Sequence, residues 1–160
     1  MSATATSWGD ASAHLAAVGV PEDVEFYREF TDGDERAVLT VPLRITHAWR
    51  INDPDLFADT FAEDGSLLVQ DNQLTSREQI REYMGKGFDG GLAGAKVTGR
   101  PLEVKFLAPG VAIVITEGGI IMNGETEIAP ERRIRACWVI VRGADGNLSL
   151  FSHQSSPIAG

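Results

Sequence analysis

Apolar residues in the first half of the chain recur at helical spacing. Between residues 34 and 50, apolar positions lie three and four residues apart, which predicts an amphipathic helix with Asp34 as its N-cap. Pro42 falls inside this window. Either the helix bends there, or it begins near Thr40 and Pro42 occupies its first turn. The positions that define this helix are Val38, Val41, Ile45, Ala48 and Trp49.

Two more helices and a short strand are predicted before residue 90. Asp53 and Pro54 are typical of a helix start, and they predict a helix over 53–62. The apolar run 66–70 predicts a strand, and Ser76 is a candidate N-cap for a third helix.

The second half of the chain changes to strand-like runs joined by short turns. The predicted strands cover 95–107, 111–122, 132–142 and 147–155. A Pro-Gly pair separates the first two of these strands, and an Asp-Gly pair separates the last two. Helices first and strands later favour an α+β fold with an antiparallel meander. The strands hold more apolar residues than one sheet face needs, so we expect the second face to pack in a homodimer.

The beginning of the chain has little periodicity. Residues 1–30 are expected to form a mobile arm, with a short helix possible over 21–30, where Val24, Tyr27 and Phe30 share one side. Residues 31–160 are expected to form a single domain.

Charge and composition narrow the classes of partner. The formal net charge of −9 repels phosphate backbones, so we expect no nucleic-acid partner. No apolar run approaches the roughly 20 residues that span a bilayer, and the first ten residues do not resemble a secretory signal. We therefore expect a cytoplasmic protein without a membrane partner. The single cysteine, Cys137, reads as a small buried hydrophobe rather than a reactive thiol.

No motif predicts a bound cofactor or metal. Residues 85–90 match the spacing G-x-G-x-x-G, but they follow a helix and precede a strand, the reverse of a dinucleotide site. We expect a flexible loop there. The histidines His14, His47 and His153 have no metal-ligand spacing, so no metal site is predicted.

Two titratable residues are the candidate acid or base groups. His153 stands on the last predicted strand and reads either as a general acid or base or as a structural histidine. Glu117 ends an apolar strand. It is either a half-buried carboxylate with a raised pKa or a surface position at the edge of a strand.

Aromatic residues and one arginine are the candidate ligand contacts. Arg135 either enters a pocket or pairs with the acidic stretch 125–131. Four aromatic residues from different predicted elements either line an apolar cavity or belong to the ordinary core. These four are Trp49, Tyr83, Phe88 and Trp138.

Four segments occur in an order that resembles the nuclear transport factor two-like superfamily over about residues 34–157. They are AWRINDPDLFADTFAEDGSLLV, SREQIREYM, LEVKFLAPGVAIVITEG and RRIRACWVIVRGADGNLSLFSHQSSP. Within that superfamily the chain resembles the SgcJ/EcaC group, which is related to SnoaL-like polyketide cyclases and ketosteroid isomerases. The arginine-rich strand, the Asp-Gly turn and the terminal His-Gln-Ser-Ser are the most telling pieces.

This resemblance implies a cone-shaped curved sheet around helices, a homodimer through the open sheet face, and a ligand pocket between sheet and helices. Isomerases and cyclases of the superfamily use a pocket aspartate as proton acceptor. Here Asp71, with Gln70 and Asn72 beside it, falls near the corresponding region.

The function that the resemblance implies lies in the biosynthesis of enediyne antibiotics. The first hypothesis is a protein that binds, and cyclises or isomerises, an unsaturated polyketide intermediate. Glu117, Asp71 or His153 would then act as acid or base without metal or nucleotide. The second hypothesis is a non-catalytic partner that docks on the polyketide synthase. The third is a ligand-sensing domain of the same fold.

Overall fold

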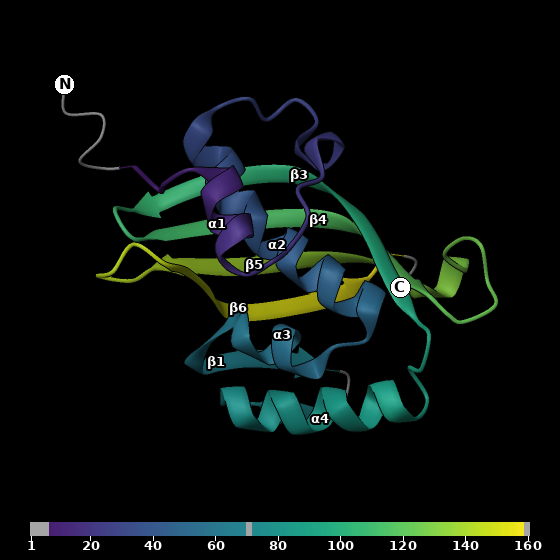
Figure 1. Ribbon diagram of the computed structural model, residues 1–160. Coiled ribbons are helices and arrows are strands. Elements are labelled where there is room, and N and C mark those ends of the chain that lie inside the picture. The colour runs from purple at the N-terminus through teal and green to yellow at the C-terminus, as the bar shows by residue number, and fades with distance from the viewer. Residues whose placement is uncertain (1–6, 70–71, 159–160) are drawn as a thin grey trace.

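The structure is a computed structural model that describes residues 7–69 and 72–158. Its helices precede its long strands, apart from a strand pair inserted between α3 and α4 (Figure 1). The helical segments are α1 (Ala11–Ala17), η2 (Val24–Tyr27), α2 (Gly33–Ile51), α3 (Pro54–Asp59), α4 (Arg77–Asp89) and η3 (Pro130–Arg132). The strands are β1 (Phe61–Val69), β2 (Asn72–Leu74), β3 (Lys96–Ala108), β4 (Val111–Ile121), β5 (Arg133–Arg142) and β6 (Leu148–Pro157).

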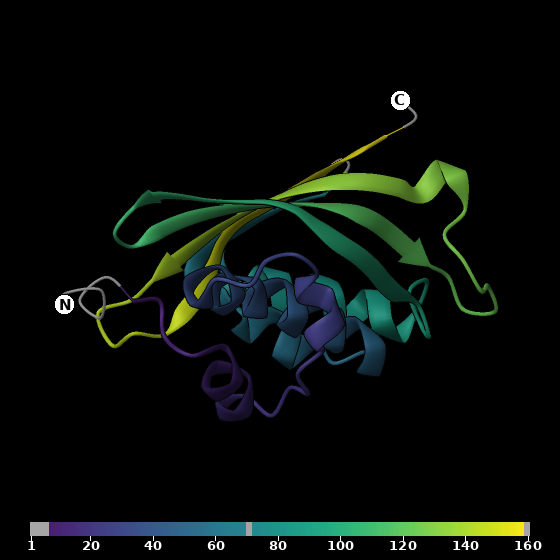
Figure 2. The ribbon, with the colours of Figure 1, turned by 90° about the horizontal axis from the view of Figure 1, so that it is seen from above.

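Six strands form one sheet in the order β2-β1-β6-β5-β4-β3. Strands β3 to β6 make the predicted antiparallel meander, and the α+β class with a curved, unclosed sheet is confirmed. Strand β1, for which no pairing was predicted, runs parallel to β6. The sheet curves over helices α1 to α4, which lie on its concave side (Figure 2).

Side chains alternate between the two faces of the sheet. In the middle of β4 and β5 the even-numbered residues are buried against the helices, and Val114 and Ile140 are 0% exposed. The odd-numbered residues, such as Ile115 and Val139, lie on the opposite side and keep part of their surface exposed. We call these the inner face and the outer face. The alternation follows from strand geometry, in which successive side chains point to opposite sides.

Local capping signals set most helix ends. Asp53 and Ser76 cap α3 and α4 as predicted, each accepting hydrogen bonds from main-chain N–H groups of the first turn. The N-cap of α2 lies two positions earlier than expected, because the carboxylate of Asp32, not that of Asp34, accepts those bonds. The helix then continues through Pro42 to Ile51. Helix α3 ends at Asp59, and Phe61, which falls within the predicted helix 53–62, begins β1 instead.

The expectation of a mobile N-terminal arm is corrected from residue 7 onward; residues 1–6 lie outside the described part. Trp8, Leu15 and Tyr27 are 3%, 1% and 0% exposed, so this segment belongs to the core of the domain. The Tyr27 hydroxyl donates to Glu22 at 2.8 Å, and the ring of Trp8 lies 5.5 Å from that of Phe106. The contact between Trp8 and Phe106 joins residues far apart in the chain, which is why local periodicity did not predict it.

The expected loop at residues 85–90 is also corrected, since α4 continues through Gly85 and Gly87 to Asp89. Phe88 is 6% exposed and its ring contacts Trp49. Burial of this aromatic side chain offsets the poor helix propensity of the two glycines.

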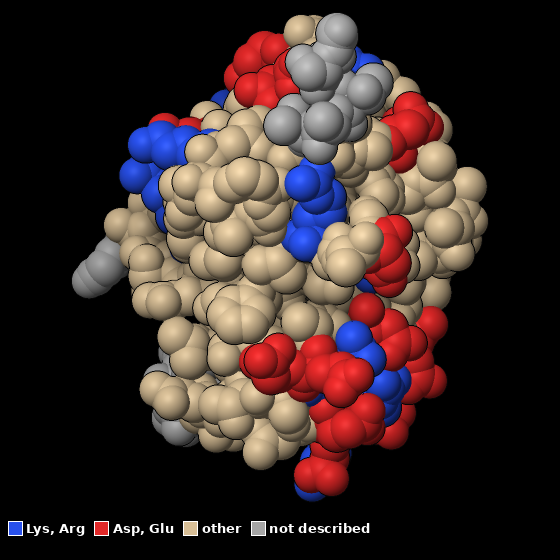
Figure 3. All heavy atoms as spheres, turned by 90° about the vertical axis from the view of Figure 1, so that its left-hand side faces the viewer, with Lys and Arg blue, Asp and Glu red and all other residues tan. Residues whose placement is uncertain are grey.

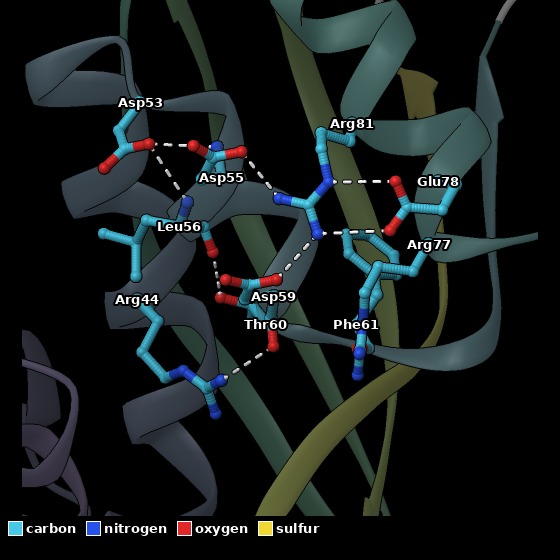
Figure 4. A network of polar contacts seen from close by, with 10 residues as sticks. All are labelled: Arg44, Asp53, Asp55, Leu56, Asp59, Thr60, Phe61, Arg77, Glu78 and Arg81. Carbon is cyan, nitrogen blue, oxygen red and sulfur yellow. Dashed lines mark hydrogen bonds and ion pairs between the residues drawn. The ribbon is translucent and has the colours of Figure 1, made fainter.

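Three arginines connect α3, α4 and β1 through hydrogen bonds and ion pairs (Figure 4). Arg81 ties α4 to α3 through Asp55 at 2.7 Å and Asp59 at 2.9 Å. Arg77 and Arg44 donate instead to main-chain oxygens around the start of β1. Acidic side chains crowd the side of the molecule where α3 and α4 lie (Figure 3).

None of the helices in the described part of the chain combines the length and apolar character needed to cross a membrane.

Candidate functional site

His153 and Trp138 form a stacked pair on the inner face. Their rings lie 4.1 Å apart at an interplanar angle of 30°, and the two residues are register partners on β6 and β5. The indole Nε1 of Trp138 donates a 2.9 Å hydrogen bond to the buried hydroxyl of Thr116 on β4. On the other side of His153 lies Leu67 of β1. This row places one histidine in an otherwise apolar and aromatic surface.

A β-bulge in β6 aims His153 inward. Leu150 pairs with Ile140 and Ser152 pairs with Val139, so Phe151 is an extra residue between them. Without it, simple alternation from buried Leu150 would turn His153 to the outer face. Bulges commonly re-aim a side chain in this way.

The imidazole of His153 is held neutral and keeps one nitrogen without a partner. Burial lowers the pKa of His153 to about 4, while a backbone hydrogen bond with Cys137 acts in the opposite direction. Its Nδ1 is shielded from solvent and has no hydrogen-bond partner within the described residues. A buried polar atom of this kind costs about 1–3 kcal/mol when it is left unpaired. A ligand that offers a hydroxyl or carbonyl group would satisfy it.

Trp49 and Phe88 form a second aromatic pair on the helical side of the same core. Their rings lie 5.3 Å apart in an edge-to-face arrangement, and both residues are less than a tenth exposed. Asn52, in the left-handed conformation at φ 51°, ends α2 beside Trp49. Its side chain accepts from the Gly94 N–H at 2.7 Å and donates to the Ala95 oxygen at 3.1 Å. These bonds fasten the segment after α4 to the end of α2.

Glu117 and Arg135 lie together, but on the outer face. Nε of Arg135 is 3.4 Å from Oε1 of Glu117, and the two are register partners. Arg100 and Arg133 also approach the Glu117 carboxylate, at 3.5 and 3.7 Å. The sheet therefore separates Glu117 from His153, and one small ligand cannot contact both side chains.

The remaining predicted site residues are spread out. Tyr83 is 37% exposed on α4, and Asn72 is exposed at the start of β2. Gln70 and Asp71 lie outside the described residues. The structure thus brings together Trp138 with His153, Trp49 with Phe88, and Glu117 with Arg135.

Sequence reasoning missed Thr116 and Arg100. The hydroxyl of Thr116 fixes the Trp138 ring, and Arg100 completes the group of arginines around Glu117. Both roles depend on cross-strand register. A Cβ on Gly118 would lie 2.0 Å from the Thr98 oxygen, so only a glycine lets β3 approach β4 this closely beside Glu117. The glycines next to Glu117 were the available signal for such an approach.

A separate open hollow of about 300 Å³ lies where the N-terminal segment meets the β3–β4 turn. Trp8, Asp34 and residues 106–109 line it. The Asp34 carboxylate accepts the Trp8 N–H at 2.8 Å, so this acid is already engaged in holding the segment. None of the predicted site residues lines this hollow.

Comparison with known protein structures identifies the fold. No family model matches the chain, and no curated protein matches it either. Among solved structures, a cystatin-like domain of unknown function from Nostoc punctiforme is similar with a TM-score of 0.72 and 21% identity, over 79% of this chain and 78% of that one.

Two further similar structures extend this result. A putative calcium/calmodulin-dependent protein kinase II association domain from Xanthomonas campestris has a TM-score of 0.65 and 24% identity, over 79% of this chain and 89% of its own. A nuclear transport factor two-like protein of unknown function from Shewanella oneidensis has a TM-score of 0.62 and 13% identity, over 74% and 95%. At these identities the likeness concerns architecture alone, and the chain has the nuclear transport factor two-like fold.

Proposed function

We propose that the inner face binds a small, largely apolar ligand that carries one uncharged polar group. The observation that supports this is the buried, unpartnered Nδ1 of His153 beside the stacked ring of Trp138. Protein interiors rarely leave such an atom unpaired, and exceptions often mark a functional position.

The surroundings favour a flat, unsaturated ligand. Trp138, Trp49 and Phe88 belong to one buried core between helices and sheet, and their rings favour stacking or edge contacts with a conjugated system. Because His153 is neutral at pH 7, it would meet a hydroxyl or carbonyl group rather than a carboxylate. A polyene intermediate of enediyne or related polyketide biosynthesis fits this chemistry.

The catalytic form of the proposal is a metal-free isomerisation or cyclisation. A neutral imidazole can accept a hydrogen bond from an enol hydroxyl or donate one to a carbonyl oxygen without carrying charge. In this form His153 orients the reacting oxygen. Asp71, which the resemblance places near the region of the family's pocket aspartate, takes a proton from one carbon of the ligand and returns it to another. Glu117 lies on the far side of the sheet and is left out of this mechanism.

The test is to incubate the purified chain with the unsaturated product released by an enediyne polyketide synthase, and to analyse bound and free material by chromatography and mass spectrometry. We expect retention of the polyene and at least tenfold weaker retention in His153→Phe. His14→Phe is the matched control, since His14 lies on α1 at the side of α2 away from the sheet. Equal retention by all three proteins would rule out the site. A product of altered mass or retention time would make the protein an enzyme.

We propose, second, that the outer face is an interface between two copies of the chain. Ile113, Ile115 and Val139 lie there partly exposed, and no described element covers them. Ile115→Glu would convert a dimer to a monomer in sedimentation velocity, whereas a wild-type monomer at micromolar concentration would contradict the proposal. Stable co-purification with a polyketide synthase that this substitution abolishes would instead support the docking alternative.

A further inference from the structure

Three strands bring three arginines around one carboxylate on the outer face. Arg100 of β3 and Arg135 of β5 are both register partners of Glu117 on β4, one on each side. Arg133 precedes Arg135 by two residues and so shares its face. All three guanidinium groups lie 3.4–3.7 Å from the carboxylate oxygens. We call this set, with Glu117 at its centre, the arginine cluster.

The arginine cluster has more positive charge than its own carboxylate can balance. One carboxylate faces three guanidinium groups, which leaves two positive charges in a chain whose net charge is −9. Nearby acids are engaged elsewhere: Glu125 pairs with Arg132, and Glu103 lies 3.6 Å from Lys105. Within residues 7–69 and 72–158, Glu117 alone is an ion-pair partner of the cluster.

The guanidinium groups remain accessible and loosely held. The side chains of Arg100, Arg133 and Arg135 are 50%, 50% and 62% exposed, whereas that of Glu117 is only 16% exposed. Their distances to Glu117 exceed the 2.7–2.9 Å that is typical of a charge-assisted hydrogen bond. Each guanidinium has five N–H donors, so most donors of the cluster face solvent above the carboxylate. Arg135 donates one long hydrogen bond from Nε to Glu117 Oε1, and Glu117 therefore holds the three side chains together while using little of their hydrogen-bonding capacity.

We propose that the arginine cluster is a binding site for a dianionic phosphate group. Two uncompensated charges match the charge of a phosphate monoester, and the planar guanidinium groups suit bidentate contact with its oxygens. The site is separate from the inner face and independent of the function proposed for that face. It lies at one end of the outer face, beyond the register positions of Ile115 and Val139. The phosphate can be free in solution or part of an organic ester, and the chemistry of recognition is the same.

The test uses calorimetric titration of the full chain at pH 7.5 and low salt with two probes, inorganic phosphate and phenyl phosphate. We expect saturable binding in the millimolar range or tighter, and at least tenfold weaker binding in the double variant Arg133→Gln/Arg135→Gln. Binding of both probes identifies free phosphate as sufficient, and binding of phenyl phosphate alone identifies an ester. Arg50→Gln, an exposed arginine in the last turn of α2, is the matched control and should bind like wild type.

The direction in which one further substitution changes phosphate affinity distinguishes a phosphate site from a structural ion pair. Glu117→Gln removes the only negative charge of the cluster and should tighten phosphate binding severalfold. Circular dichroism of each variant shows whether it is folded. The absence of saturable binding for both probes, or equal binding by wild type and the double variant, would overturn the proposal. Weaker binding by a folded Glu117→Gln variant would overturn it as well.

Discussion

The same strands form both faces of the sheet, but the polar groups on the two faces differ in charge and in exposure to water. On the inner face, His153 is neutral, stacked on Trp138 and surrounded by apolar side chains. On the outer face, Glu117 is charged and surrounded by three arginines. Two side chains that are neighbours along a strand lie on opposite faces and so in different environments. The polar group on each face is therefore set by strand parity and burial.

Different forces also act at the two faces. The inner face depends on burial, which varies little with salt but makes protonation costly. The outer face depends on charge in contact with water, which salt screens. Substitutions on the two faces should thus differ in size and in their response to solution conditions.

The largest expected effect is on the inner face. Trp138→Ala removes an indole that is 7% exposed, together with its bond to Thr116, and should lower the free energy of unfolding by about 3–5 kcal/mol. Urea denaturation followed by far-ultraviolet circular dichroism measures this loss.

The control for this prediction is Trp138→Phe. It keeps an aromatic ring against His153 but gives up the hydrogen bond to Thr116, so about 1–2 kcal/mol should be lost. If both variants were as stable as wild type, the inner face would not be the packed core that its burial indicates.

The next effect is a pH dependence of stability that arises from His153. Its pKa is about 4 in the folded chain and about 6.5 when unfolded, so the unfolded state takes up the proton first as pH falls. Stability from this group is fully present above pH 6.5 and is lost between about pH 6.5 and 4. We expect a loss of about 2 kcal/mol, less than the full shift would give, because the side chain keeps some exposure.

Denaturation curves of wild type and His153→Gln between pH 7 and 4 measure this effect. The wild-type chain should lose more stability than the variant over that range, whatever the offset between them at pH 7. Parallel curves would mean that His153 is protonated as easily in the folded as in the unfolded state.

A smaller effect is expected at the centre of the outer face. Glu117→Gln leaves three arginines close together without a counter-charge and should cost about 1 kcal/mol at low ionic strength. Added salt should shrink this cost because screening weakens the repulsion. Glu103→Gln, at an exposed carboxylate beside Lys105, is the control and should show less change. A cost at Glu117 that did not respond to salt would point to packing instead of charge.

The smallest effect is expected for Arg135→Gln. Its side chain is 62% exposed and its distance to Glu117 is 3.4 Å, so the unfolding free energy should change by less than about 0.5 kcal/mol. Thermal denaturation is sensitive enough to check this. A large loss would show that the outer face is more tightly coupled to the fold than its exposure indicates.

Local signals predicted most of the elements but not their faces. Asp53 and Ser76 could be read as caps because capping depends on neighbours three residues away. Strand alternation shows that Thr116 and Glu117 face opposite sides, but it does not show which side the helices cover. The candidate set therefore combined residues from both faces.

The position of His153 was hidden for a different reason. The bulge at Phe151 inserts one residue into β6 and reverses the parity that Leu148 and Leu150 establish. Nothing in the sequence FSHQSS predicts that insertion, because it depends on how β5 pairs with β6. The packing of Trp8 was likewise invisible, since its partner Phe106 lies far along the chain.

The pairing of β1 with β6 has a consequence for how the chain reaches this structure. Strand β6 follows the other five described strands along the chain, yet it lies between β1 and β5 in the middle of the sheet. A nascent chain that ends before Leu148 can form the β1–β2 pair and the β3–β5 meander, but no strand joins them. Completion of the sheet must wait for residues 148–157 to leave the ribosome. This long-range closure favours slow folding with transiently exposed strand edges.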